Sequence, residues 1–135
     1  MLFIYYLPFD KSRVVLPNNG YINANYVTSL HGNAIYIAAQ GPLPNTINHF
    51  WEMVWNENSR LIVMLTPLKE SSRVKCEQYW PDEGKSLYFS DIGLSICADN
   101  GSNHVVSTGL KRRNFQLRSK SNEIRDVAMI HFERW

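Results

Sequence analysis

Two cysteines are the residues of this sequence best suited to nucleophilic chemistry, and their neighbours argue against that role. A nucleophilic cysteine needs surroundings that lower its thiol pKa, such as the N–H groups at the start of a helix or a nearby arginine. Cys76 is followed by the bulky, acidic run EQYWPD, and Cys97 is followed by ADNGSN. Neither run contains arginine, so the sequence predicts that neither thiol is a nucleophile.

The other reactive residue types lack the partners that a site requires. The two cysteines give no disulfide framework, and no His, Cys and Asp cluster has zinc spacing, so we expect no metal and no cofactor. His104 and His131 lie in alternating stretches, where strand surface or core positions suit them better than ligand positions. The triplet Gly84-Lys85-Ser86 is not a nucleotide-binding loop, because position 79, where that loop needs glycine, is Tyr79.

One pair of opposite charges stands in a polar segment. Residues 67–76 are polar and charged, which predicts a loop or a ribbon that carries Glu70 and Lys75. From the residues alone, this pair is an ordinary solvated ion pair.

Three elements before this segment set the plan of the fold. Residues 36–39 form a short apolar stretch that stops at Gly41-Pro42, and residues 61–65 form an unbroken apolar run, which predicts a strand covered on both faces. Between them, apolar residues recur at helical spacing from Ile47 to Trp55, with Asn45 or Thr46 as N-cap and residues 56–58 as the end. Strand, helix and strand together predict an α/β layer.

The helix and the strand at 61–65 carry large apolar side chains that must be buried. Trp51 and Trp55 share one helical face with Phe50, and each large side chain gains about 1.5–3 kcal/mol on burial. We expect this face and the strand to receive cover from residues outside these 135.

The remaining sequence predicts strands. Residues 20–27 alternate as in a half-buried strand, and a hairpin across residues 30–34 joins them to the strand at 36–39. Short alternating stretches follow at residues 87–89, 94–97, 104–108, 114–117 and 126–132.

Composition limits the range of functions. The chain has 135 residues, 44% of them hydrophobic, which suits one globular domain or part of one. The net charge is +2, with seven basic and three acidic residues after position 110, which indicates a solvated surface rather than a nucleic-acid site. Residues 1–9 are apolar but too short to span a membrane, and they lack a basic flank and a cleavage site.

The chain resembles the tyrosine-specific protein phosphatase family. The runs AAQGPLPNT, HFWEMVW, IVMLT and KCEQYWP follow one another in the order and spacing of that family. The resemblance covers almost the whole chain but only the N-terminal half of the family's domain. It implies an α/β fold with a twisted mixed sheet and flanking helices, incomplete at the C-terminus, for residues 1–135. It also implies phosphotyrosine-containing proteins as partners and a cytoplasmic location, either as a cytoplasmic protein or as the cytoplasmic part of a larger protein. From the residues themselves we expect no nucleic-acid partner and no membrane segment in this chain.

The resemblance assigns supporting roles and no catalytic residue within the chain. The family's glutamate that matches Glu70 holds the phosphate-binding arginine, and the lysine that matches Lys75 approaches the acid-bearing loop. Phe3 and Tyr5 match substrate-contacting positions, although the family has tyrosine and an acid or amide there. Trp135 matches the first residue of the W-P-D loop, whereas Trp80-Pro81-Asp82 belongs to the earlier Y-W-P element.

Two classes of function follow. The first is a phosphatase in which a cysteine thiolate attacks phosphorus, an arginine and loop amides stabilise the oxygens, and an aspartic acid protonates the leaving tyrosine. The resemblance places these three groups beyond Trp135, so the chain alone is predicted to be inactive. The second is a non-catalytic half-domain that serves as a binding or regulatory module.

Overall fold

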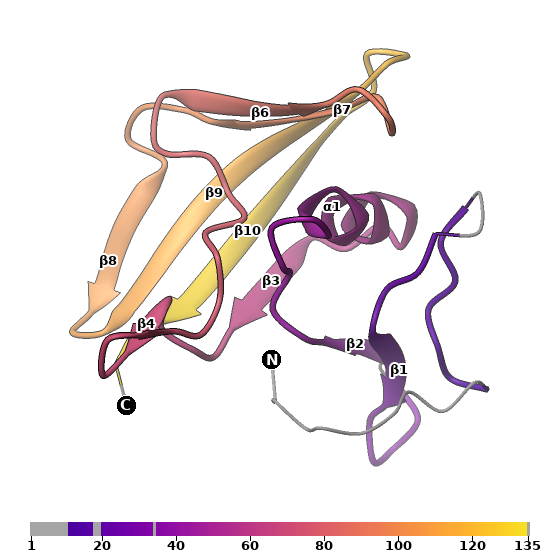
Figure 1. Cartoon of the computed structure of the whole chain (residues 1–135), viewed down its shortest axis with the longest axis horizontal. Helices are drawn as coiled ribbons and strands as arrows, with labels where there is room; N and C mark the ends of the chain where they lie inside the picture. Colours follow the sequence, from indigo (N-terminus) through magenta and orange to yellow (C-terminus); the bar gives the residue numbers. More distant parts are fainter. Residues whose placement is uncertain (1–10, 18–19, 34, 135) are drawn as a thin grey trace.

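The computed structural model describes residues 11–17, 20–33 and 35–134, which form three sheets and one helix (Figure 1). The two small sheets are hairpins, β1–β2 and β4–β5. The large sheet has six strands, and its core-facing side packs against the helix α1. The elements in chain order are β1 (Ala24–Thr28), β2 (Ile35–Ala39), α1 (Ile47–Asn56), β3 (Leu61–Met64), β4 (Lys69–Glu70), β5 (Arg73–Val74), β6 (Lys85–Phe89), β7 (Leu94–Ala98), β8 (Asn103–Ser107), β9 (Leu110–Ser119) and β10 (Ile124–Phe132).

The large sheet is mixed, as predicted. Its strand order is β3-β10-β9-β7-β6, with β8 beside β9, and only the β3–β10 pair is parallel. The expected flanking helices are reduced to α1 in the part of the chain that the structure describes, where strand dominates. The described residues therefore form a mixed β-sheet with one helix, and most of their regular structure is strand.

The helix α1 begins and ends where the sequence predicts. Thr46 is the N-cap residue, but its hydroxyl accepts a hydrogen bond from the Leu43 N–H at 2.9 Å instead of bonding to the helix. At the other end Asn58 has a φ of 53°, in the left-handed region, and the Ser59 N–H bonds back to the Val54 carbonyl at 3.1 Å. This left-handed residue stops the helix.

The cover of the Trp51 face comes from within the chain, contrary to expectation. Trp51 is 0% exposed, and its ring lies 5.7 Å from that of Phe115 on β9 in an edge-to-face arrangement. Its indole N–H donates to the Tyr79 carbonyl at 2.6 Å. The segment around Tyr79 and the long strand β9 supply the contacts that helical spacing alone could not reveal.

The prediction that the strand at 61–65 is covered on both faces is wrong for the described residues. Ile62 and Met64 are buried, whereas Leu61 is 56% and Val63 is 42% exposed. The physical reason is that the helix α1 covers one face of the sheet, and no described element covers the other face at this strand. Alternation in burial along an uninterrupted apolar run marks a strand with one open face.

The hairpin at residues 30–34 is confirmed, although its first strand is shorter than predicted. β1 and β2 pair antiparallel from Ala24 opposite Ala39 to Thr28 opposite Ile35. Residues 20–23 are not in a strand, because the Ala24 N–H bonds to the carbonyl of Ile22 at 3.0 Å in a tight turn. The later strands are confirmed, and β9 extends to Leu110, ahead of the predicted start at Asn114.

Candidate functional site at the carboxyl ends of the parallel strands

The parallel strands β3 and β10 end at the same edge of the large sheet. Their register runs from Ala128 opposite Leu61 to His131 opposite Met64. In open sheets of parallel strands, ligands bind outside the carboxyl ends of the strands, and β3 and β10 are the parallel pair of this mixed sheet. The β4–β5 ribbon follows β3 here, and Glu133 and Arg134 follow β10, so this edge is the candidate site.

His131 joins three segments at this edge. Its ring is 1% exposed, and its Nε2 lies 2.8 Å from the Thr66 carbonyl just after β3. Its Nδ1 lies 3.1 Å from an Arg113 guanidinium nitrogen. Because arginine only donates, Nδ1 must accept, and therefore Nε2 carries the proton and donates to Thr66.

Burial keeps this imidazole neutral. Desolvation lowers the pKa of His131, and the positive charges of Arg113 and Lys111 lower it further, outweighing the opposite effects of the Thr66 carbonyl and Glu133. With both ring nitrogens engaged and the neutral form favoured, His131 holds β10 to the end of β3 and is not available as a general acid or base.

Arg113 and Glu133 complete a charged cluster around the histidine. Arg113 donates to Glu133 at 3.2 Å, and Lys111 pairs with the same carboxylate at 2.9 Å. Burial alone would raise the pKa of Glu133, but the hydrogen bonds from Lys111 and Arg113 lower it below its ordinary value. The Arg113 guanidinium also lies 4.9 Å from the Trp80 ring centroid, a cation–π contact.

Sequence reasoning missed the Arg113–Glu133 pair, although a signal was present. Arg113 shares its alternation phase with the buried Phe115 and Leu117, and Glu133 shares its phase with His131. Two opposite charges on core-facing positions of neighbouring strands predict a buried ion pair. The signal was missed because the strand was predicted to begin at Asn114, one residue after Arg113, whereas β9 begins at Leu110.

The ribbon carries the predicted Glu70–Lys75 pair on the surface. Glu70 Oε2 and Lys75 Nζ are 3.2 Å apart, and their side chains are 64% and 44% exposed. Ser71 and Ser72 form the turn with φ values of 45° and 68°. The Glu70 carboxylate is therefore open to solvent, with Lys75 as its ion-pair partner.

The surroundings of Cys76 and of Asp82 in the W-P-D triplet argue against catalytic roles for these two residues. Cys76 is buried, and burial, together with the Glu77 charge, raises the pKa of its thiol to about 11. A thiol with this pKa is almost entirely protonated near neutral pH, which disfavours nucleophilic attack. Asp82 accepts a hydrogen bond from the Gln78 side chain at 2.8 Å and serves a local turn.

The remaining predicted site positions are not described. Phe3, Tyr5 and Trp135 lie outside the described residues. Within the described ranges, no group of three or more His, Cys, Asp or Glu side chains could hold a metal ion. In the same ranges, no helix is long and apolar enough to cross a membrane.

Comparison with known proteins identifies the class. The protein-tyrosine phosphatase family model matches residues 4–135, so the chain belongs to the protein-tyrosine phosphatase family. It is 42% identical to "Receptor-type tyrosine-protein phosphatase eta" of Gallus gallus, over 96% of this chain and 9% of that protein. It is 41% identical to "Tyrosine-protein phosphatase Lar-like" of Caenorhabditis elegans, over 94% of this chain and 6% of that protein. The chain thus spans less than a tenth of the length of these two relatives.

Proposed function

We propose that the protein hydrolyses phosphotyrosine in proteins through a cysteine–phosphate intermediate, without a metal. The chain would supply the framework and supporting residues, and residues outside these 135 would supply the nucleophilic cysteine, the phosphate-binding arginine and the aspartic acid. Membership of the family supports this reaction. The sequence supports the division of labour, because neither Cys76 nor Cys97 has an arginine six positions later. We place this activity on the cytoplasmic side of the cell.

The observation that carries the proposal is the ordered edge at the carboxyl ends of β3 and β10. His131, Arg113 and Glu133 hold this edge by hydrogen bonds of 2.8–3.2 Å. A fixed edge is what a catalytic loop that follows β10 would need, because positioning within a fraction of an ångström contributes much of an enzyme's rate. Trp135 would begin that loop in our proposal.

Glu70 and Lys75 would act on the chemistry through other groups. Glu70 would hold the phosphate-binding arginine, and Lys75 would approach the loop that carries the acid. Their exposure suits this role, because an incoming guanidinium can reach the carboxylate without displacing a buried partner. Phe3 and Tyr5 would contact the substrate, with the Phe3 ring stacking on phosphotyrosine.

One observation supports the alternative of a non-catalytic binding module. Trp51, Phe115, Ile96 and Met129 are buried within this chain, so the helix and the large sheet share a core of their own. A module that acts alone requires such a core.

The test compares the 135-residue chain with a longer form of the protein that contains a His-Cys-x5-Arg sequence. With para-nitrophenyl phosphate, the chain alone should show no turnover above a buffer blank, because the catalytic unit acts together. In the longer form, Glu70→Ala should lower kcat by about 10–100-fold, by analogy with the loss of a residue that orients a catalytic group. Glu77→Ala, an exposed acid nearby on the same segment, is the matched control and should leave kcat unchanged.

Three results would contradict the proposal. Turnover by the chain alone that disappears in Cys76→Ser would place the nucleophile within these residues. Wild-type kcat in Glu70→Ala would remove the supporting role. A longer form with the catalytic sequence but no activity would favour the binding module.

A further inference from the structure

The strand β8 is an exposed edge of the large sheet. All five of its residues are exposed, with Val105 at 74% and Val106 at 58%. It pairs along one side with β9, and no other strand among the described residues pairs with it. Figure 1 shows it at the margin of the sheet, away from the helix α1. Its outer side therefore presents backbone N–H and C=O groups to solvent.

This edge lacks most of the features that usually block strand addition. Natural edge strands are commonly protected by lysine, proline, inward charges or a covering element. β8 has the sequence NHVVS, with no lysine, arginine, acid or proline. Its one irregularity is a shift of register between Val105 and Ser107. The chemistry of the strand is suited to receive another extended segment.

The surroundings of β8 are basic. Residues 100–122 contain five basic residues and no acidic one: Lys111, Arg112, Arg113, Lys120 and Arg118. Arg113 is buried against His131, but Arg112 is exposed and lies directly opposite His104 in the β8–β9 register. Among the described residues Arg112 forms no ion pair, and its Nε donates to the Asn114 side chain at 3.2 Å.

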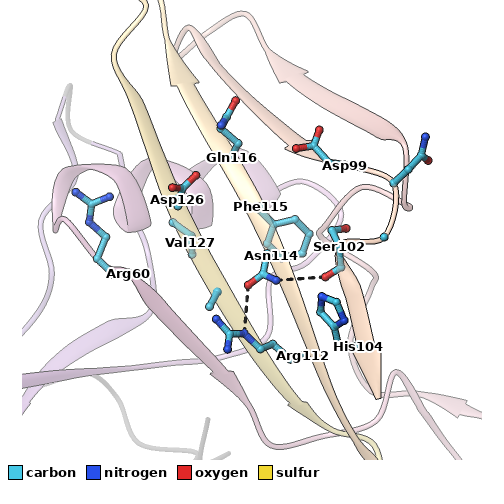
Figure 2. Close-up of a pocket in the computed structure, with 13 residues that line it drawn as sticks. Arg60, Asp99, Ser102, His104, Arg112, Asn114, Phe115, Gln116, Asp126 and Val127 are labelled. Atoms are coloured by element: carbon cyan, nitrogen blue, oxygen red, sulfur yellow. Dashed lines mark hydrogen bonds between the residues drawn. The ribbon is translucent and has the colours of Figure 1, made fainter. Parts of the chain in front are cut away.

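The two faces of the β8–β9 pair differ in character. His104 and Arg112 line an open trough of about 570 Å³ on the sheet face opposite α1. Figure 2 shows them toward one end of this trough, and Asp99 and Asp126 toward the other. Val105 pairs with Lys111 in the next position, so its side chain lies on the opposite face from His104. An added strand would therefore lie beside His104 on one face, with the Arg112 guanidinium one strand further in, and beside the exposed Val105 on the other face, where Lys111 is its partner on β9.

We propose that the outer edge of β8 binds an extended, acidic peptide segment of a partner protein as an additional strand. Alternate side chains of the segment would be acidic and face Arg112 and His104, and the residues between them would be apolar and face Val105. Backbone hydrogen bonds would supply affinity, and this alternation would supply specificity. A second copy of the chain fits less well, because β8 paired with β8 would bring two Arg112–His104 sets together.

The probe is a fluorescein-labelled, end-capped heptapeptide of alternating glutamate and valine, titrated with the chain in a fluorescence anisotropy assay. We expect saturable binding, and a peptide with lysine in place of glutamate should not bind. A glutamate–valine peptide with N-methylated alternate amides should also fail to bind, because it cannot donate across the new strand pair. Arg112→Glu should weaken binding about tenfold or more, because it replaces an attraction by a repulsion.

Arg118→Glu is the matched control on the same strand. Arg118 is also exposed, but it lies opposite Ser95 of β7, away from β8, so its reversal should preserve most of the affinity. Absence of binding by the wild-type chain would overturn the proposal, as would equal binding of the N-methylated peptide or equal losses in the two variants. A dimer in size-exclusion chromatography that the peptide does not dissociate would assign the edge to a second copy instead.

Discussion

The two rows of side chains along β10 are both largely apolar, yet only one of them is buried. Val127, Met129 and His131 are at most 2% exposed and lie under α1 and the segment around Tyr79. Ala128, Ile130 and Phe132 alternate with them on the other face and are only partly buried. The difference shows that position relative to the helix, and not the hydrophobicity of a row, decides which face of this sheet forms the core.

The open face is itself divided. Near β3 it is apolar, with Leu61 and Val63 exposed beside Ile130. Near β8 it is polar, with Arg112, Asn114 and Gln116 lining the trough (Figure 2). A contiguous apolar surface of this kind usually marks a contact with another segment or partner. The polar part requires no cover, which is consistent with a separate role for the edge at β8.

The largest loss of stability should follow from truncating Trp51, which is buried between α1 and the covered face of the sheet. Trp51→Ala removes a fully buried ring and its hydrogen bond to the Tyr79 carbonyl, so we expect a loss of about 3–5 kcal/mol in the free energy of unfolding. Equilibrium unfolding in urea, followed by circular dichroism, measures this change.

The matched control lies on the open face. Val63→Ala should cost less than about 1 kcal/mol, because the side chain is 42% exposed and leaves no closed cavity. Equal losses in the two variants would show that both faces are covered in solution. A small loss in Trp51→Ala would show that the helix does not pack on the sheet as described.

Much of the fold could be predicted from the sequence because the spacing of hydrophobic residues and the positions of turn residues are local properties. Helical spacing located α1, alternation located β7 and β10, and the turn residues located the hairpin between β1 and β2. The cover of each element could not be predicted, since it depends on contacts between residues far apart in the chain. Trp51 packs on Phe115, 64 positions away, and no local pattern encodes that contact.

The candidate site could be predicted only in part, for the same reason. The Glu70–Lys75 pair could be predicted because its two residues lie five positions apart on one ribbon. The cluster of His131, Arg113 and Thr66 joins three elements, and it depends on the register of β3, β10 and β9. Alternation phase could have placed Arg113 in the core, but it could not have identified the carbonyl that fixes the histidine tautomer.

The second-largest effect should be a dependence of stability on pH, caused by His131, which is buried on the covered face. The folded-state pKa of His131 lies below its ordinary value of 6.5, so the unfolded state binds more protons as the pH falls through that value. The free energy of unfolding should therefore decrease below about pH 6.5. The pKa of Glu133 is lowered from 4.5, so its contribution to the free energy of unfolding should be lost only at more acidic pH.

Unfolding in urea between pH 5 and 8 measures this dependence. His131→Gln should flatten the slope in this window, whereas His104→Gln on the exposed strand β8 should retain it because His131 still titrates. A slope in His131→Gln equal to that of the wild type would assign the dependence to another group.

The smallest effect is expected at the exposed Glu70–Lys75 pair. Both side chains are largely in water, where an ion pair gains little against the cost of ordering two long side chains, so the coupling should be at most about 1 kcal/mol. A double-mutant cycle with Glu70→Gln and Lys75→Gln isolates this coupling, and high salt should reduce it further. A larger coupling that persists in high salt would show that the pair stabilises the fold. A small coupling, combined with a large loss of kcat in the longer form of the protein, is the result expected if Glu70 serves the reaction and not the fold.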